Sequence, residues 1–259
     1  MQDLFTLKGR SALITGGSRG IGRMIAAGFL AHGARVYISA RKASACDQTA
    51  AELSAEFPAQ GKCVSLPADV STVEGAKALA AAYAQHEGEL DILVNNAGAA
   101  WGEPFDNFPE SGWDKVVDLN LKAPFFLTQA LAPLLRKAGE KHVAKVINIA
   151  SIDGISVNPQ ETYSYAASKA GLIHLTHRMS LRLIQDNIAV SAIAPGAFAS
   201  NMNKEARDHA DEISSRIPSG RIGTDEDMAG AAIYLASRAG DYVVGQTIVV
   251  DGGVTLARG

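Results

Sequence analysis

The stretch Thr15-Gly16-Gly17-Ser18-Arg19-Gly20-Ile21-Gly22 decides the fold of this chain. It follows a short apolar run and precedes an apolar pattern of helical period. Glycines in such a strand-to-helix turn let the chain tighten and let its backbone approach a pyrophosphate at the helix N-terminus. The spacing Gly-x-x-x-Gly-x-Gly departs from the commoner Gly-x-Gly-x-x-Gly, so a plain glycine-rich turn is the alternative. The residues expected to contact a dinucleotide here are Gly16, Ser18, Arg19, Gly20, Ile21 and Gly22.

The rest of the chain repeats the strand-helix alternation. Short apolar or β-branched runs predict strands buried on both faces at residues 11–15, 35–39, 63–68, 91–95, 145–150, 189–194 and 247–251. Stretches rich in Ala, Leu and Glu predict helices at residues 20–32, 43–57, 72–87, 111–137, 163–185 and 225–237. Strict alternation implies right-handed crossovers, and therefore one doubly wound α/β sheet of about seven parallel strands with helices on both faces. No linker, repeat or low-complexity segment divides it, so we expect one domain over residues 1–259.

The composition excludes several classes of protein. Of the 259 residues, 47% are hydrophobic and 20% are charged, with 24 Lys plus Arg against 27 Asp plus Glu and a net charge of −3. Such a chain can bury a sizeable core, which excludes disordered, collagen-like and disulfide-scaffold classes. No long run of one charge sign occurs, so we expect neither nucleic acid nor a membrane as a partner.

The sequence also predicts a cytoplasmic protein without a metal. The only cysteines, Cys46 and Cys63, form no Cys-x-x-Cys pair, which suits a reducing compartment and gives no zinc spacing. His174 and His177 have no third ligand at matching spacing, so solvated or packing roles are favoured. The N-terminus lacks the layout of a signal peptide, and no apolar run approaches the roughly 18 residues of a membrane span.

The end of the second predicted strand indicates which dinucleotide is bound. NAD-binding units place an acidic residue there for the ribose 2′-hydroxyl, whereas this chain has Arg41. An arginine fork pairs with a 2′-phosphate that a carboxylate would repel, so NADP is favoured, with Arg19 as a second cation. The alternative is that Arg41 is only a solvated residue opening a helix. Asp69 and Val70, after the third strand, are expected at the adenine end, although Asp69 could instead cap the next helix.

A second group of residues predicts proton chemistry. Tyr165 and Lys169 are four apart on a predicted helix, so their side chains share one face. An adjacent ammonium stabilises a phenolate, so we expect Lys169 to lower the pKa of Tyr165. Tyr163 has Ala167 at that spacing and lacks such a partner. Tyr-x-x-x-Lys alone is a weak signal, but Ser151 at the end of a predicted strand, upstream of this helix, strengthens it.

With these residues in place, the chain from Leu7 to Gly253 resembles the short-chain dehydrogenase/reductases. The resemblance depends on motifs in one order and spacing: Thr15-Gly16-x-x-x-Gly20-x-Gly22, Asn95-Asn96-Ala97-Gly98, Asn120, Ser151, Tyr165-x-x-x-Lys169 and Pro195-Gly196. It implies a Rossmann-type fold, a nicotinamide cofactor and carbonyl/alcohol interconversion. It also implies Tyr165 as general acid, Ser151 as the hydroxyl that orients the substrate oxygen, and Lys169 as modulator of the tyrosine and ribose ligand. The implied role of Asn120 is a backbone carbonyl that holds a relay water.

The sequence offers its own reason for the role of Asn120. If a helix runs through Pro124, the missing N–H at 124 leaves the Asn120 carbonyl without its ordinary donor, and a freed carbonyl can hold water. The equally weighted alternative is that Pro124 starts a helix and Asn120 lies in the preceding loop.

Further cofactor contacts are expected at two other strand ends. Asn96, Ala97 and Gly98 follow the fourth strand, where small residues allow close approach to the adenosine half of a cofactor; a structural turn is the alternative. After the sixth strand, Pro195 and Gly196 resemble the family's Pro-Gly loop, and Ser200 stands where relatives usually carry Thr, keeping a hydroxyl for the carboxamide.

Long connections at residues 98–110, 151–162 and 195–223 follow strand ends, where ligands bind in open α/β sheets, and are candidates for substrate handling. Trp101, in the first of them, either walls a substrate pocket or packs structurally. The overall pattern, including residues 96–102, looks most like 3-oxoacyl reductases, among them the NADPH-dependent rhamnolipid-pathway type. Sugar-acid reductases of the gluconate 5-dehydrogenase kind are the alternative, and a non-catalytic NADP-binding regulator is the rival from another class.

The expected substrate is therefore a small ketone or an acyl thioester. Gln185-Asp186-Asn187 at the end of the Tyr165 helix offers no cation for an acidic carrier protein, which leaves a coenzyme A ester or a free ketone. Residues 123–135 are uncharged and apolar nearly all round, with Phe125, Phe126, Leu127, Leu131, Leu134 and Leu135. Such a helix needs cover on all sides, and the resemblance implies tetramers built from it and from the Tyr165 helix, so we expect a homotetramer.

Overall fold

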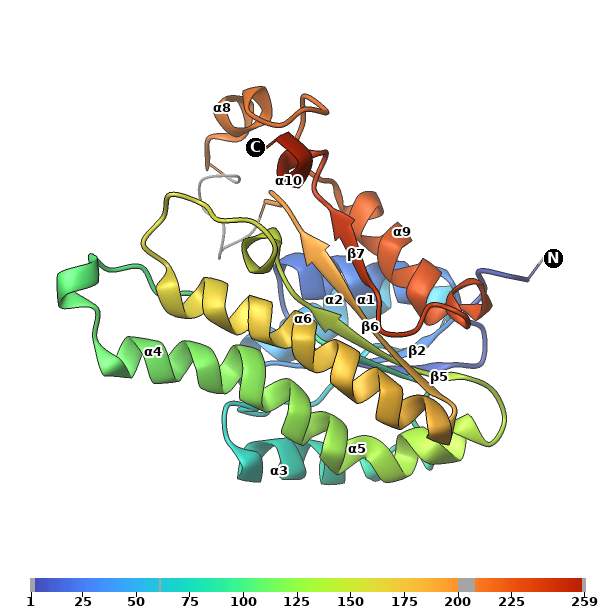
Figure 1. Ribbon diagram of the computed structural model, residues 1–259. Helices are drawn as coiled ribbons and strands as arrows, with labels where there is room; N and C mark the ends of the chain where they lie inside the picture. Colours follow the sequence, from blue (N-terminus) through green and yellow to red (C-terminus); the bar gives the residue numbers. More distant parts are fainter. Residues whose placement is uncertain (1–2, 61, 200–207, 258–259) are drawn as a thin grey trace.

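The computed structural model describes residues 3–60, 62–199 and 208–257, and Figure 1 shows a central sheet between layers of helices. The seven strands pair in the order β3-β2-β1-β4-β5-β6-β7, and every pair is parallel. This arrangement confirms the predicted doubly wound sheet. The strands are β1 Ser11–Thr15, β2 Arg35–Ser39, β3 Val64–Ser65, β4 Ile92–Asn95, β5 Ala144–Ile149, β6 Ile188–Pro195 and β7 Thr247–Val250.

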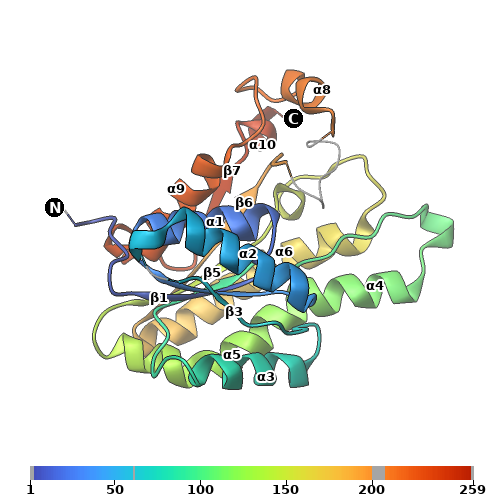
Figure 2. The same cartoon turned by 180° about the vertical axis from the view of Figure 1, so that it is seen from behind.

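Two helical layers cover the sheet. Figure 2 shows α1 and α2 on one side and α3 and α5 on the other. One buried apolar cluster joins α1, α2 and α9 to the sheet, and a second joins α3, α5 and α6 to its other face. The α-helices of the described residues are α1 Gly20–Ala31, α2 Ala43–Glu56, α3 Val73–Ala84, α4 Glu110–Val117, α5 Ala123–Gly139, α6 Tyr163–Leu183, α8 Ala210–Ser215, α9 Asp225–Ala236 and α10 Val254–Ala257.

The two edge strands depart from the prediction of strands buried on both faces. Strand β3 spans only Val64–Ser65, although backbone bonds from Leu66 to Ile38 and from Ala68 to Ala40 continue its pairing with β2. Pro67 lies between these two donors, at a position whose N–H would point to the open edge of the sheet, so its missing N–H costs no bond to β2. Both β3 and β7 are only partly buried, because each has a neighbouring strand on one side alone. The central strands β1, β4, β5 and β6 are buried throughout, as predicted.

The helix predicted at residues 111–137 is a continuous helical path with a π turn inside it. Helix α4 passes into a π turn at Asp118–Lys122 and then into α5. The amide of Ala123 donates to the carbonyl of Asp118, five residues back. Pro124 therefore lies within a continuing helix and does not begin a separate one. Of the two interpretations of Pro124, the structure supports a helix that runs through it.

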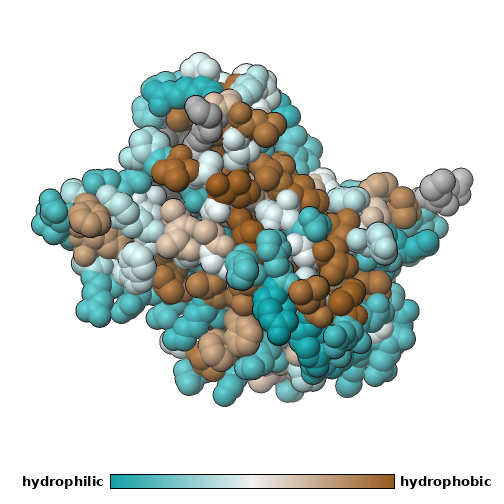
Figure 3. Space-filling view, in the orientation of Figure 1, coloured by the Kyte–Doolittle hydropathy of each residue, from teal (hydrophilic) through white to brown (hydrophobic). Residues whose placement is uncertain are grey.

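The long connections lie where the strands end at their carboxyl edge, and they contain short helices that the sequence did not predict. Phe105–Asn107 and Ile152–Gly154 are 3-10 turns, and α8 lies in the connection after β6. In Figure 3, hydrophobic side chains gather between α6 and the segment that carries α8 and α10. Within the described ranges, no helix is both long and apolar enough to cross a membrane.

Candidate active site

The glycine-rich turn between β1 and α1 is shaped by backbone conformations that only glycine adopts readily. Gly16 and Gly20 have φ angles of +65° and +52°. Gly22 begins the packed part of α1, where an added Cβ would lie 2.3 Å from the carbonyl oxygen of Gly16. The amide of Gly17 donates to the carbonyl of Ser39, so the turn lies against the end of β2. A side chain on Gly22 would fill the space between the turn and α1. With glycine there, the turn suits close approach by a pyrophosphate at the N-terminus of α1.

Thr15 and Asn96 hold the turn in place. The Thr15 hydroxyl accepts hydrogen bonds from the backbone amides of Asn96 and Ala97, each 3.0 Å long. The Asn96 side chain in turn donates to the carbonyls of Thr15 (2.9 Å) and Gly16 (3.2 Å). Asn96 therefore supports the glycine turn directly, a contact between β1 and β4 that the sequence analysis missed. The signal available in the sequence was a hydroxyl residue, Thr15, immediately before Gly16. In the structure Thr15 is 2% exposed.

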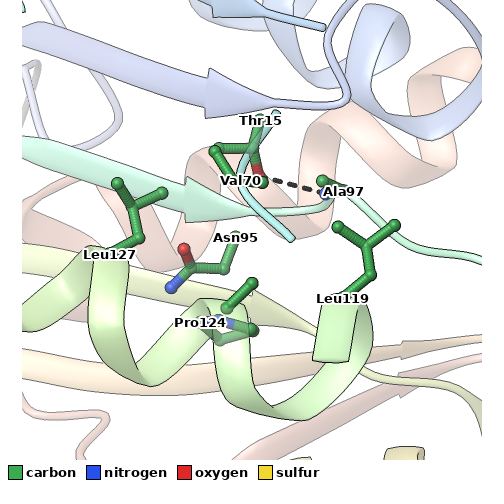
Figure 4. Close-up of a pocket in the computed structure, with 8 residues that line it drawn as sticks. Thr15, Val70, Asn95, Ala97, Leu119, Pro124 and Leu127 are labelled. Atoms are coloured by element: carbon green, nitrogen blue, oxygen red, sulfur yellow. Dashed lines mark hydrogen bonds between the residues drawn. The ribbon is translucent and has the colours of Figure 1, made fainter. Parts of the chain in front are cut away.

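A small, largely apolar pocket lies behind this turn. In Figure 4, Thr15, Val70 and Ala97 face the helical residues Leu119 and Pro124, and the dashed line marks the bond from Ala97 to Thr15. The buried Asn95 beside them donates to Thr128 (3.2 Å) and to Asn148 (2.9 Å). The pocket is lined by Thr15, Val70, Asn95, Ala97, Leu119, Ala123, Pro124 and Leu127. The π turn and the start of α5 thus pack directly beneath the residues that hold the glycine turn.

The charged residues expected to select the cofactor lie at the rim. Arg19, at the N-cap of α1, and Arg41, two residues beyond β2, are both exposed. Burial tends to raise the pKa of Asp69, but hydrogen bonds from Ser71 and the charge of Arg41 bring it below its usual value. Asp69 therefore shares an electrostatic environment with Arg41. The cap of α3 is Thr72, which accepts from Gly75, so Asp69 does not cap that helix.

The three catalytic candidates meet where β5 ends. Ser151 follows β5 and is 6% exposed, Tyr165 lies in the first turn of α6, and Lys169 one turn later is 5% exposed. The ammonium of Lys169 donates to the carbonyl of Ile149 (2.6 Å) and lies 5.7 Å from the ring centre of Tyr165. The helix places both side chains on one face, as their spacing predicts.

The pKa of Tyr165 differs from the expectation. Burial raises the pKa of this phenol to about 12; the Ser151 hydroxyl opposes the rise and the Asp153 carboxylate adds to it. Burial also lowers the pKa of Lys169 to about 8. The expected lowering of the tyrosine pKa by Lys169 is therefore wrong for this structure, because desolvation is the largest influence on the phenol and the ammonium is directed at a backbone carbonyl.

Asn120 links the π turn to the catalytic helix. Its side chain is buried, accepts from the amide of Ala99 (2.8 Å), and donates to the Ala99 carbonyl (2.9 Å) and the Ser168 hydroxyl (3.1 Å). Ser168 in turn donates to the carbonyl of Tyr165 (2.8 Å). Because Pro124 has no N–H, the Asn120 carbonyl lacks the usual donor four residues on. π turns inside helices often occur at functional sites.

The remaining predicted residues lie at the end of β6 and in the connection after β4. Pro195 ends β6, and the amide of Gly196 donates to Val250, while an added Cβ on Gly196 would meet Asp251 at 2.8 Å. Ser200 lies outside the described residues. The Trp101 ring packs against Gly112 and lies 5.1 Å from the Lys115 ammonium, which favours the structural role.

His174 and His177 make an edge-on ring contact with centroids 6.1 Å apart. Within the described part of the chain, no group of three or more His, Cys, Asp or Glu residues could hold a metal ion.

Comparisons with known proteins agree with this geometry. Residues 16–255 match the family described as enoyl-(acyl carrier protein) reductase. The chain is 46% identical to a rhamnolipids biosynthesis 3-oxoacyl-[acyl-carrier-protein] reductase of Pseudomonas aeruginosa (99% of this chain, 100% of the relative). It is 34% identical to a gluconate 5-dehydrogenase of Gluconobacter oxydans, with 98% of each covered.

Among solved structures, the Pseudomonas aeruginosa RhlG/NADP active-site complex superposes with a TM-score of 0.93 at 46% identity, covering 98% of this chain and 100% of that one. Because these similarities span nearly the whole sequence and include the motifs of the site, the chain belongs to the short-chain dehydrogenase/reductase family.

Proposed function

We propose that this protein is an NADPH-dependent reductase that transfers a hydride to a ketone, preferably the ketone of a 3-oxoacyl thioester. The observation that carries this proposal is the meeting of Ser151, Tyr165 and Lys169 at the end of β5. A glycine turn suited to a dinucleotide begins at the end of β1, in the same sheet. The similarity to a 3-oxoacyl-[acyl-carrier-protein] reductase supports the substrate class.

In the proposed reaction, the reduced nicotinamide supplies the hydride, and residues of this chain handle the proton. Tyr165, with a pKa of about 12, stays protonated at neutral pH and donates its proton to the substrate oxygen. The Ser151 hydroxyl holds that oxygen in position. Lys169 binds the cofactor ribose, and its charge helps to stabilise the phenolate left behind. The Asn120 carbonyl holds a water that returns a proton to the site.

NADP is the proposed cofactor. Three features of the chain fit NADP. The glycine-rich turn allows close approach, the exposed cations Arg19 and Arg41 lie beside the ends of β1 and β2, and no acidic residue stands at the end of β2. The similar RhlG structure is an NADP complex. The residues proposed to contact the cofactor are Gly16, Ser18, Arg19, Gly20, Ile21, Gly22, Arg41, Asp69, Val70, Asn96, Ala97, Gly98, Tyr165, Lys169, Pro195, Gly196 and Ser200.

The end of α6 argues against recognition of an acidic carrier protein. Asp186 accepts from Arg136 (2.8 Å) and Arg182 (3.2 Å), so both nearby cations are already paired with a carboxylate. An incoming acidic surface would have to compete with Asp186 for them. We therefore propose a coenzyme A ester or a small free ketone in preference to a carrier-bound substrate.

A sugar-acid ketone is the second candidate substrate, favoured by the similarity to gluconate 5-dehydrogenase over nearly the whole chain. The test is NADPH oxidation with acetoacetyl-coenzyme A, a carrier-bound 3-oxoacyl group and 5-ketogluconate, with NADH in parallel. Turnover of the thioester with NADPH is expected. Turnover of the keto acid alone would favour the second candidate, and tight NADPH binding without turnover of any ketone would identify a regulator instead.

We also propose that the protein assembles as a homotetramer through α5 and α6. On α5, Leu127, Leu131 and Leu135 are buried, whereas Phe125 is 39% exposed; on α6, Leu181 is 65% exposed. These outward apolar side chains gain cover if two copies pack α5 and α6 together. Light scattering at micromolar concentration is expected to give the mass of four chains, and the mass of one chain would refute the proposal.

Two further proposals concern the chain as a whole. The continuous sheet supports one dinucleotide-binding and catalytic domain, which predicts a single cooperative unfolding transition. Cys46 and Cys63 are free and buried, which supports a reducing, cytoplasmic location. Separate transitions, or secretion of the mature protein, would contradict these two proposals respectively.

A further inference from the structure

The connections after β4 and β5 meet at one carboxylate. Residues 98–109 follow the β4 turn, and residues 151–162 begin at Ser151 and lead into α6. Figure 1 shows the segments that enter α4 and α6 running beside each other at one side of the molecule. We propose that Glu161 positions these two connections and thereby fixes the substrate side of the active site. The proposal rests on the reductase function proposed above, and Glu161 acts through its neighbours, not on the reacting atoms.

Glu161 makes the bonds that join the two connections. Its Oε1 accepts from the backbone amide of Phe105 (3.2 Å) and from the hydroxyl of Tyr163 (3.0 Å). Its backbone carbonyl accepts from the amide of Glu103 (3.2 Å). One residue thus holds the 103–105 backbone and the start of α6 together, and two of the three bonds depend on a single side-chain oxygen.

Aromatic packing surrounds the same junction. The Tyr163 ring makes edge-on contacts with Phe105 (5.6 Å between centroids) and Phe108 (5.7 Å). Phe105 is nevertheless 72% exposed and Tyr163 is 37% exposed, so burial alone holds this region weakly. The hydrogen bonds to Glu161, which are also exposed, add directional contacts to this packing.

The first turn of α6 lacks a side-chain cap. Its N-cap, Thr162, makes no side-chain capping bond, and the first turn contains no acidic residue. Tyr165 lies in that first turn, two residues after Tyr163. A shift of the junction would consequently displace the end of α6 that carries the proton donor, together with the connection that begins at Ser151.

The expected effect falls mainly on substrate binding. Glu161→Ala removes both side-chain bonds but leaves the backbone bond to Glu103, so α6 should still form. We expect KM for the ketone to rise about tenfold, the loss that one or two hydrogen bonds of this kind produce. Lys169 remains anchored to Ile149 by its own bond, so kcat should change less than about threefold.

Three further variants separate positioning from general damage. Glu161→Gln keeps Oε1 as an acceptor for both donors, so KM should stay within about threefold of the parent. Tyr163→Phe removes one bond and keeps the ring, so its KM should be intermediate. Asp47→Ala removes an exposed acid on α2, outside both connections, and should leave both constants unchanged.

Hydrogen exchange gives a readout independent of turnover. In Glu161→Ala, the amides of residues 103, 105–108 and 160–165 should exchange faster than in the parent, and Glu161→Gln should restore their protection. An unchanged KM and unchanged exchange in Glu161→Ala would overturn the proposal, as would a Gln variant as impaired as Ala. If the parent reduces no ketone, the reductase function fails, whereas the exchange result still decides whether Glu161 joins the two connections.

Discussion

Gly22→Ala should weaken cofactor binding by forcing the glycine-rich turn away from α1. The added Cβ would lie 2.3 Å from the carbonyl oxygen of Gly16 and 2.5 Å from the side-chain Nδ2 of Asn96. The first of these contacts is with backbone that cannot rotate away. Relief requires the glycine turn and α1 to separate by about 1 Å. Overpacking of this kind lowers the free energy of unfolding by about 1–3 kcal/mol. The replacement of glycine by alanine inside a helix offsets about 0.5–1 kcal/mol of this loss.

The displaced groups are the backbone amides proposed to meet the pyrophosphate. Hydrogen bonds to a charged group are worth roughly 1.5–3 kcal/mol each, so the loss of even one of these contacts should lower NADPH affinity at least about tenfold. The assay is fluorescence titration with NADPH, paired with thermal unfolding.

Gly230→Ala is the matched control, because this exposed glycine within α9 has no atom near a new Cβ. It should gain about 0.5–1 kcal/mol and bind NADPH unchanged. Parent-like NADPH affinity in Gly22→Ala would refute the assignment of the turn.

Four variants test the rest of the site. Tyr165→Phe should lower kcat by about 10²–10⁴ with NADPH binding retained, while Tyr163→Phe should affect mainly KM; equal turnover by the parent and Tyr165→Phe would disprove the proton donor. Arg41→Asp should weaken NADPH at least about tenfold in steady-state measurements, and a parent that prefers NADH would contradict this cofactor choice. Lys169 has a pKa of about 8 when folded, below its ordinary value, so only the unfolded chain holds this proton between pH 8 and 10. The free energy of unfolding should therefore rise with pH in that range, by up to about 1.4 kcal/mol per pH unit, relative to Lys169→Met; parallel curves from urea titrations would contradict the shift.

The features predicted from the sequence are those that depend on local patterns. Buried parallel strands read as short apolar runs, which is why β1, β4, β5 and β6 were placed closely. Helical spacing placed Tyr165 and Lys169 on one face of α6 for the same reason. The lengths of the edge strands were less predictable, because each edge strand pairs with a neighbour on one side only.

The features missed are side-chain bonds between distant segments. Thr15 accepts from residues 81 and 82 positions away, Asn120 reaches Ser168 across 48 positions, and Glu161 reaches Phe105 across 56. No local pattern marks these partners, because their proximity results from the order of strands in the sheet. Thr, Asn, Ser and Glu also serve commonly as solvated surface residues, so residue type alone did not identify them.

The pKa values of Tyr165 and Lys169 depend on burial more than on the spacing of the two residues. A helical tyrosine and lysine four residues apart predict a lowered phenol pKa in water, yet burial of both groups raises the pKa of Tyr165 to about 12 and lowers that of Lys169 to about 8. Desolvation disfavours the charged form of each group, so it keeps the phenol protonated and makes the ammonium easier to neutralise. A protonated phenol is the form that ketone reduction requires. In the proposed reaction, Lys169 and the Ser151 hydroxyl would stabilise the phenolate formed by proton transfer, so the lysine would contribute mainly after the proton has left.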